Sequence, residues 1–480
     1  MRIAHPVALI IDLDGTLVKT DCLYENANAY LVKTPLSIFK FLHHFLKGRA
    51  HFKYFLSSSS KLDADLLPYN MQLINWIQAE KDNGRHIILA TASHRLIADS
   101  VAMHLNLFDE VFATEGEINL KSYEKQRLIV SKFGELGFDY VGNEMDDIPV
   151  WKSARSAYIV TSSSVLVARV SEIGNLAQVF NDDKPPLLQS LLKAMRPHQW
   201  LKNILIFVPL FAAQLYGDIS SIINLSLAFI VFGLTASSAY VLNDLVDIEN
   251  DRRHPRKKLR PFAAGNVNLL YGWLLWPTLL VIAFTISILT LPTLFLAVQA
   301  SYLALTFAYS FFLKKKVIVD VITLAGLYTI RIIAGITAIS VPLSFWLLSF
   351  SMFIFSSLAF VKRFSEIKTI QCSESPINLA GRGYFLEDLE LVSSMGIGAG
   401  YISVLVLALY IQDISITHLY HRPEFIWLAC PLLLFWISRI WLIAHRGNMH
   451  DDPVYFAAKD RTSWFILVGF ALLFLLARFI

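Results

Sequence analysis

Long apolar runs dominate the sequence from about residue 185 to its end. A membrane-spanning helix needs about 20 predominantly apolar residues. Hydrophobic residues make up 55% of the 480 residues and charged residues only 17%, which is typical of a membrane protein. The sequence therefore predicts an all-α polytopic membrane bundle of about nine transmembrane helices, of which the first is the weakest: 203–218, 221–242, 269–289, 293–312, 317–339, 342–361, 394–411, 424–444 and 463–479.

Basic residues gather in alternate loops of this region. Lys and Arg follow the second, fourth, sixth and eighth apolar segments, whereas the opposite loops carry little beyond Arg422. Because loops rich in Lys and Arg stay on the cytoplasmic side, we expect them to face the cytoplasm together with the N-terminal residues. This pattern predicts an integral protein of the cell (inner) membrane whose N-terminal domain and active sites are cytoplasmic.

An acidic run closes the second apolar segment. Carboxylates at the edge of a bilayer are costly and usually functional. Spacings of three and four residues put Asp244, Asp247 and Asp251 on one helical face, and such oxygen ligands suit Mg²⁺ with substrate phosphates. We therefore predict a metal site there, with Asn243 as a further ligand, and phosphate-binding roles for Lys257 and Arg260 in the basic stretch that follows. The sequence indicates a membrane enzyme that handles a diphosphate.

Further charged clusters would meet this acidic run if the helices form one bundle. The predicted substrate-binding residues in them are Lys202, Tyr309, Lys314, Arg331, Lys362 and Arg363. Other interpretations stay open: Lys314 serves topology alone, Lys202 grips lipid headgroups, or Asp320 and Arg331, which share a helical face, form a structural pair.

These motifs resemble those of the UbiA superfamily of intramembrane prenyltransferases over about residues 185–480. Asn243-Asp244-x-x-Asp247-x-x-x-Asp251 is similar to the first acidic motif of that family. The resemblance implies Mg²⁺ and a diphosphate at this motif. Most members carry a second aspartate-rich motif after the sixth helix, where this sequence has Lys362-Arg363-x-x-Glu366.

A narrower branch of the family looks closer, the enzymes that move 5-phosphoribose from phosphoribosyl diphosphate to a polyprenyl phosphate. The resemblance is carried by Arg196-Pro-x-Gln-Trp-x-Lys-Asn203, Asp251-Arg-x-His-Pro-x-Lys257-x-x-Arg260-Pro, Tyr309-Ser-x-x-Leu-Lys314, Asp320 with Arg331, and Lys362-Arg363. It implies those two phosphate-rich substrates. Prenyl transfer from a polyprenyl diphosphate to an aromatic or quinone-precursor acceptor is the alternative, and a membrane transporter is the alternative outside enzymes.

Residues 1–184 read as a soluble α/β domain. Apolar runs at 7–11, 86–90 and 138–141 alternate with helical stretches, which predicts a doubly wound sheet. Polar residues follow each run: Asp12 and Asp14, then Thr91, then Asp146 and Asp147. Ligands bind at the carboxyl ends of such strands, so we expect these side chains to converge. Residues 181–186 look like the linker to the membrane domain, 185–480.

This order of motifs resembles the haloacid dehalogenase (HAD) superfamily of phosphotransferases. Asp12-x-Asp14-Gly-Thr16 matches its first motif, which implies Asp12 as nucleophile and Asp14 as acid/base. Thr91 matches the second motif, and Lys121 the phosphate-binding lysine, with Lys125 as its rival. Asn143 replaces the usual Asp of the fourth motif, so Glu144, Asp146 or Asp147 would supply Mg²⁺ ligands beside Asp12. Residues 23–85, mainly helical, would form the cap.

The fusion of the two halves suggests successive steps. The transferase would make a lipid that carries 5-phosphoribose, and the phosphatase would remove the 5-phosphate. An inactive or regulatory HAD fold is the alternative, because fold alone does not imply function. The three cysteines are isolated and indicate neither a disulfide framework nor a metal cluster, and nothing indicates nucleic-acid binding.

Overall fold

The computed structural model describes residues 7–34, 37–60, 62–115, 120–371, 383–412, 420–449 and 452–479. The chain divides into two compact units. The first unit comprises Met1–Met195 with Tyr240–Trp276, and the second comprises Arg196–Ala239 with Pro277–Ile480. The predicted acidic run therefore groups with the N-terminal residues.

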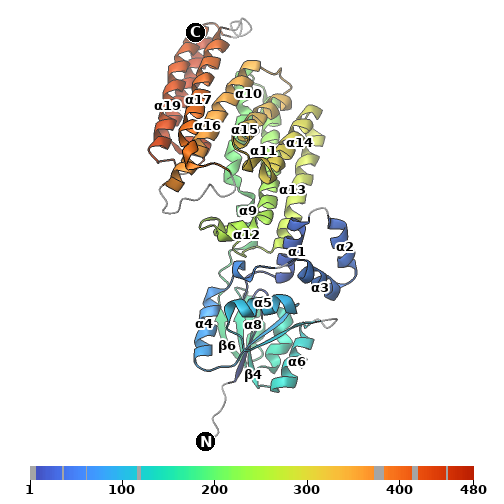
Figure 1. Ribbon diagram of the computed structural model, residues 1–480. Helices are drawn as coiled ribbons and strands as arrows, with labels where there is room; N and C mark the ends of the chain where they lie inside the picture. Colours follow the sequence, from blue (N-terminus) through green and yellow to red (C-terminus); the bar gives the residue numbers. More distant parts are fainter. Residues whose placement is uncertain are drawn as a thin grey trace. The chain divides into compact units, whose positions relative to one another are not determined.

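A six-stranded sheet forms the centre of the first unit (Figure 1). Its strand order is β3-β2-β1-β4-β5-β6, and every pairing is parallel. Strands buried on both faces read as continuous apolar runs, which is why the predicted strands are recognisable. The expected doubly wound α/β fold is confirmed. The strands are β1 (Ala8–Ile11), β2 (Ile87–His94), β3 (Glu110–Thr114), β4 (Phe138–Gly142), β5 (Ser156–Val160) and β6 (Leu176–Phe180).

Helices cover both faces of this sheet (Figure 1). Successive residues of a strand point to opposite faces, so Leu9 and Ile11 pack with α4 and α5, whereas Ile10 packs with α6, α7 and α8. These helices are α4 (Met71–Asp82), α5 (Arg95–Leu105), α6 (Tyr123–Phe133), α7 (Ile148–Ser153) and α8 (Ser164–Ser171).

Three helices between the first two strands have a small core of their own. They are α1 (Cys22–Lys33), α2 (Ile38–Leu46) and α3 (Arg49–Ser59). Tyr30, Phe52 and Leu56 are buried in that core. Together with α4, these elements confirm the expectation that this stretch is mainly helical.

The segment Tyr240–Trp276 packs against α1 and against α9 (Leu187–Met195). It contains the end of α11 (Ile219–Val246), all of α12 (Ile248–Arg253), the short 3₁₀ helix η5 (Lys257–Leu259) and the start of α13 (Leu269–Thr290). Val241, Leu245 and Phe262 form a buried apolar cluster there with Tyr24 of α1 at its edge. The acidic run is thereby held by packing within the first unit.

The second unit is helical, as expected for the membrane half (Figure 1). Besides parts of α11 and α13 it contains the 3₁₀ helix η4 (Pro197–Phe207), α10 (Val208–Ala212), α14 (Thr293–Phe311), η6 (Leu313–Lys315), α15 (Val319–Ala338), α16 (Phe345–Gln371), α17 (Leu389–Ile411), η8 (Pro423–Leu428), α19 (Ala429–His445), α20 (Pro453–Lys459) and α21 (Arg461–Phe479). Helix α15 is the most buried of the candidate spans.

Within the described ranges, eight helices are long and apolar enough to cross a membrane, by length and composition. The weakest of the nine expected spans, 203–218, is not among them, because that stretch contains the end of η4 and the five-residue α10 rather than one long helix. Pro209 starts α10, and Gln214 beyond its end takes a left-handed backbone conformation. Helix η4 instead packs closely on α15, where a Cβ at Gly335 would lie 2.0 Å from the Ile206 carbonyl oxygen.

Candidate functional site

The acidic run lies at a break between two helices of the first unit. Helix α11 ends at Val246, and Asp247 is the N-cap residue of α12. Backbone hydrogen bonds from Asp247 N to Asn243 O and from Asp251 N to Asp247 O continue across the break. The single continuous helix implied by the expected common face is therefore interrupted at Asp247.

Arg260 lies between two carboxylates of the run. Its Nη1 donates to Asp244 at 3.1 Å and to Asp251 at 2.6 Å, and both carboxylates are only 2% exposed. Burial raises the pKa of Asp251, and Arg260 opposes that shift. The basic residue predicted to bind a phosphate is thus the cation that neutralises the two acids.

These carboxylates fit a hard cation chemically, although no group of three or more His, Cys, Asp or Glu side chains in the described ranges is arranged to hold a metal ion. Mg²⁺ typically takes one or two protein carboxylates together with substrate phosphates. Asp244 and Asp251 match that smaller requirement. Asn243 and Asp247 are half-buried beside them, and Lys257 is exposed in η5.

The second unit holds a cluster of basic residues around one carboxylate, which we call the Asp452 cluster: Lys202, Tyr328, Arg331, Lys362 and Asp452. Asp452 Oδ2 accepts from Lys202 Nζ at 3.0 Å and from Lys362 Nζ at 3.1 Å, while its Oδ1 accepts from Tyr328 Oη at 3.2 Å. Lys202 and Arg331 also lie over the Tyr328 ring, at 5.7 and 5.6 Å from its centroid. Two lysines thus pair with a single acid, and Arg331 lies against the tyrosine that donates to it.

The charges of this cluster perturb one another. Burial lowers the pKa of Lys202 to about 8, assisted by Lys362 and Arg331 and opposed by Asp452. Burial would raise the pKa of Asp452, but Lys362 and Lys202 hold it below its usual range. A second anion such as a phosphate would be attracted to this excess of positive charge.

Arg331 and Asp320 are not partners in the structure, so a structural pair between them is wrong. Arg331 donates from Nε to Asn203 at 2.9 Å and from Nη2 to the Tyr302 hydroxyl at 3.1 Å. Asp320 pairs instead with Arg363 at 2.6 Å and accepts from Tyr384 at 2.7 Å. The helical face that the two residues share does not bring their side chains together.

Arg363 is fully buried and occupied by protein partners. Besides Asp320 it contacts Glu366, and it donates to the Tyr309 hydroxyl at 3.2 Å. These contacts tie α14, α15 and α16 together, so Arg363 and Tyr309 have structural contacts that the sequence did not indicate. Lys314 lies in η6, directly after α14, and is half-buried.

At the carboxyl edge of the sheet, the structure brings together most of the residues predicted for the soluble domain. Asp12 directly follows β1 and is buried, and its Oδ1 accepts from Lys125 Nζ at 2.7 Å. Lys125 also lies 3.6 Å from Asp147, whose Oδ1 accepts from the Tyr140 hydroxyl at 2.7 Å. Burial raises the pKa of Asp12 to about 7, and Lys125 opposes that shift.

Lys125, the rival residue, occupies the position expected for Lys121. Lys121 is instead paired with Asp146 at 2.6 Å, and both side chains are about half exposed. Lys125 lies in the first turns of α6 and is buried, whereas Lys121 precedes that helix. Lys125 rather than Lys121 therefore lies beside Asp12, and Asp146 lies with Lys121 rather than with Asp12.

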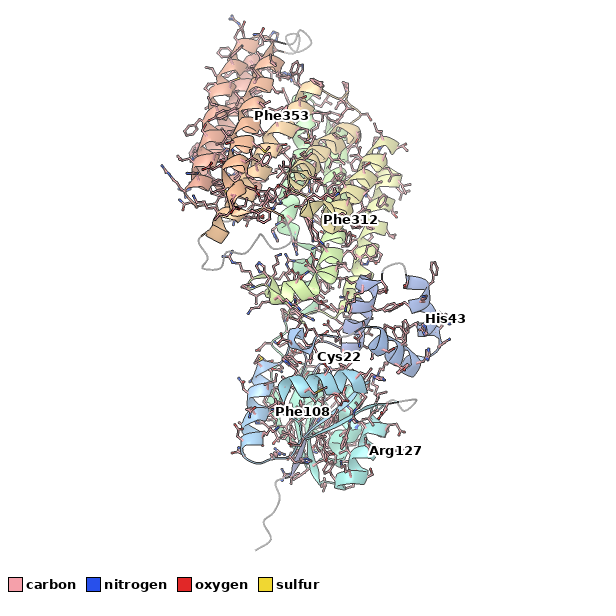
Figure 2. All side chains as sticks on the ribbon, viewed as in Figure 1. Cys22, His43, Phe108, Arg127, Phe312 and Phe353 are labelled. Atoms are coloured by element: carbon pink, nitrogen blue, oxygen red, sulfur yellow. The ribbon has the colours of Figure 1, made fainter. Side chains whose placement is uncertain are left out.

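Asp14 is held by three donors. Its carboxylate accepts from the backbone N–H of Cys22 at 2.8 Å, from Thr91 Oγ1 at 3.3 Å and from Ser93 Oγ at 2.7 Å. Cys22, labelled in Figure 2, is the first residue of α1. Thr91 therefore meets Asp14 as expected, and Ser93 is a contact that sequence reasoning did not single out.

Asn143 lies against the turn after β1. Its Oδ1 accepts from Thr16 Oγ1 at 3.0 Å, and a Cβ at Gly15, which has φ +73°, would lie 2.2 Å from its Nδ2. Gly15 thus permits both the turn and the close approach. The side chains of Asp12, Asp14 and Asn143 offer oxygen donors of the kind that Mg²⁺ prefers.

Helix α1 connects this site to the acidic run. Arg252, next to Asp251, donates to both carboxylate oxygens of Glu25 at 2.6 and 3.1 Å, and the pair is buried. Asn28 donates to the Leu245 carbonyl oxygen at 2.9 Å and accepts from Trp273 Nε1 at 3.0 Å. One helix of the N-terminal domain therefore contacts both sides of the acidic run.

The second unit contains most of the helices that are long and apolar enough to cross a membrane, and comparison with known proteins gives the family. Residues 204–466 match the UbiA prenyltransferase family. The chain belongs to this family, which confirms the resemblance found in the sequence.

Three relatives show how widely the similarity extends. The chain is 36% identical to the protein y4nM of Sinorhizobium fredii over 98% of this chain and 90% of the relative. It is 39% identical to the nodulation protein NoeC of Azorhizobium caulinodans over 58% of this chain and 90% of the relative. It is 31% identical to the decaprenyl-phosphate phosphoribosyltransferase of Mycolicibacterium smegmatis over 60% of this chain and 95% of the relative.

Proposed function

We propose that the protein transfers 5-phosphoribose from phosphoribosyl diphosphate to a polyprenyl phosphate, in a Mg²⁺-dependent reaction at the cytoplasmic side of the inner membrane. The Asp452 cluster carries this proposal. Where most members of the family have a second acidic motif, this chain has Lys362. Lys362 and Lys202 both donate to the Asp452 carboxylate, and Arg331 lies over the ring of Tyr328, which donates to the same carboxylate. Cations rather than acids suit two phosphate-rich substrates.

The acidic run would serve the leaving group. Asp244 and Asp251, with Asp247 and Asn243 beside them, would hold the Mg²⁺, which neutralises the charge that develops on the diphosphate. Arg260 would turn from the two carboxylates toward the diphosphate oxygens once the metal is bound. A fixed cation aimed at developing charge is among the largest contributions to catalysis.

The cationic residues would position the acceptor. Lys202, Lys362 and Arg331 would bind phosphate oxygens, with Lys257 and Lys314 as further phosphate contacts. An oxygen of the lipid phosphate attacks C1 of ribose, the bond from C1 to the diphosphate oxygen breaks, and diphosphate leaves with the electron pair. No general base is needed because the nucleophile is already anionic.

The soluble site would then act on the product. Asp12 would attack phosphorus to form an aspartyl-phosphate, which is established covalent chemistry for a carboxylate. Asp14 would donate a proton to the departing 5-oxygen of ribose and later activate the water that releases phosphate. Lys125 would hold the phosphoryl oxygens. The final product would be a lipid-linked pentose without its 5-phosphate.

The proposed donor is tested in two parallel reactions. Purified protein is given Mg²⁺ and a polyprenyl phosphate with labelled phosphoribosyl diphosphate, or an aromatic acceptor with a polyprenyl diphosphate. We expect labelled, ribosylated lipid from the first reaction and no prenylated acceptor from the second. Prenylation of the aromatic acceptor without any ribosylated lipid would contradict the proposal and favour the alternative that the family name suggests.

A further inference from the structure

Helices α2 and α3 of the first unit form a hairpin with unusual composition. From Thr34 to Ser60 the sequence contains Lys40, Lys47, Arg49 and Lys53 but neither Asp nor Glu. Aromatic and aliphatic residues fill most of the remaining positions of α2. Basic amphipathic helices of this kind are typical of segments that lie on a membrane surface.

One side of α2 packs on the rest of the hairpin. The Phe41 ring lies edge-on to Phe52 of α3 with centroids 5.0 Å apart, and the His44 ring stacks on Phe55 at 3.8 Å. Phe41 also stacks on Tyr30 of α1 at 6.2 Å. The hairpin is therefore a packed part of the first unit, and α2 is fixed in one rotational orientation.

The opposite side of α2 leaves large apolar residues uncovered. Phe39 and Leu46, seven residues apart and so on one face of the helix, are 81% and 83% exposed. Phe45 is 57% exposed but packs edge-on to Phe52 of α3, with centroids 5.4 Å apart, and so belongs to the packed side. His43 is exposed on the same helix (Figure 2). Contiguous exposed apolar surface with a polar rim marks an interaction site.

Hydrogen bonds hold the hairpin at the end of membrane-spanning helices. Helix α1, on which it packs, bonds through Asn28 to the Leu245 carbonyl of α11 and to Trp273 of α13, and both α11 and α13 are candidate spans. Trp273 is in the first turns of α13, where tryptophan marks the boundary of the bilayer. The hairpin thus lies where headgroups are available.

We propose that α2 is a binding site for the bilayer surface, with Phe39 and Leu46 inserted among the acyl chains and Lys40 and Lys47 paired with anionic phospholipid headgroups. The net positive charge excludes a preference for cationic or neutral surfaces, since each basic residue gains from a negative surface potential. The site would hold the helices around Asp14 against the membrane, whatever substrate the two active sites take.

The test uses spin-label accessibility in the full-length protein. Leu46→Cys, in a Cys372→Ser background, is labelled with a nitroxide in phosphatidylglycerol nanodiscs, and collision rates are measured with oxygen and with a water-soluble nickel complex. Met103→Cys on α5 is the matched control, because Met103 is similarly exposed, at 76%. We expect a several-fold higher ratio of oxygen to nickel collisions at position 46 than at position 103.

The second part of the test varies the charge of the lipid headgroups and of α2. In phosphatidylcholine nanodiscs, or after Lys40→Gln with Lys47→Gln in phosphatidylglycerol, the ratio at position 46 should fall toward that of the control. A nickel accessibility at position 46 equal to the control overturns the proposal. Shielding of position 46 from both oxygen and nickel also overturns the proposal, because protein would then cover α2. An equal ratio of oxygen to nickel collisions in phosphatidylglycerol and in phosphatidylcholine overturns the preference for anionic headgroups.

Discussion

At the scale of single residues, buried carboxylates of the candidate sites have basic partners. Asp12 has Lys125, Asp452 has Lys202 and Lys362, and Asp244 and Asp251 share Arg260. A buried charge without a partner is strongly destabilising. Activity measurements on variants of these residues therefore need a measurement of folding beside them.

Lys125→Ala should lower phosphatase turnover by about 10²-fold or more, since it removes a fixed cation that stabilises negative charge at the reacting group. Lys121→Ala should leave turnover close to that of the unchanged protein, because Lys121 pairs with Asp146 at the surface. Phosphate release from a generic ester, with thermal unfolding as control, measures both. The opposite ranking would restore Lys121 as the phosphate-binding residue.

Asp251→Asn should raise the Mg²⁺ concentration needed for half-maximal transfer and lower the maximal rate by about 10²-fold. Glu249→Gln is the matched control, because Glu249 is exposed on the same short helix. A Mg²⁺ titration of phosphoribosyl transfer distinguishes them. If Asp251→Asn needs no more Mg²⁺ than the control, the acidic run does not hold the metal.

Transfer should weaken as pH rises through about 8, where Lys202 loses its proton. The ordinary pKa of lysine is 10.5 and burial lowers that of Lys202, so the charge that binds phosphate is present below pH 8 and lost above it. The KM for the phosphate substrates should therefore increase above pH 8. In Lys202→Arg, which stays charged, that increase should disappear, and an unchanged profile would contradict the role of Lys202.

At the scale of elements, the sequence predicted eight long helices but did not predict the short helices η4 and α10. Eight apolar segments became helices long enough to span because length and apolar composition decide that outcome. The segment 203–218 instead contains the end of a 3₁₀ helix and a helix of five residues, and its Ile206 carbonyl lies in close contact with Gly335 of α15. Hydrophobic periodicity does not predict this contact, because Ile206 and Gly335 lie far apart in the sequence.

Some site residues were likewise predictable from the sequence, and others were not. Asp12, Asp14 and Thr91 were predictable because parallel strands bring their carboxyl ends to one edge. The choice between Lys121 and Lys125 depended on where α6 begins, which sequence patterns do not locate to within a few residues. The partners of Asp320 and Arg331 depended on which helices pack on α15, and only the structure supplies that.

Helix α1 should be a positioning element of the acidic run. Glu25→Gln leaves Arg252 buried without its charged partner, which typically costs about 3–5 kcal/mol, and should lower both thermal stability and transferase activity. The exchange Glu25→Arg with Arg252→Glu should recover part of both. Asp63→Asn, in the exposed pair with Arg253, serves as control, and a Glu25→Gln protein with normal transfer would contradict the proposed positioning.

At the scale of the whole molecule, an α/β half and a helical membrane half are joined in one chain. The Sinorhizobium fredii relative matches 98% of this chain, so it has counterparts of both halves. In the Mycolicibacterium smegmatis relative, 60% of this chain already covers 95% of the protein, so that relative is too short to hold both. Counterparts of both halves therefore occur together in one of these relatives and not in the other.

The central claim is that the two halves act in succession, the membrane half adding 5-phosphoribose to the lipid and the soluble half removing the 5-phosphate. Mass spectrometry of the lipid product tests this claim most directly. Unchanged protein and Asp12→Asn are each incubated with Mg²⁺, phosphoribosyl diphosphate and a polyprenyl phosphate. The masses of the extracted lipids are then measured. We predict a pentose-bearing lipid without the 5-phosphate from the unchanged protein and the same lipid with the 5-phosphate from Asp12→Asn. Lipid without any pentose in both reactions, or identical products from both, would contradict the account.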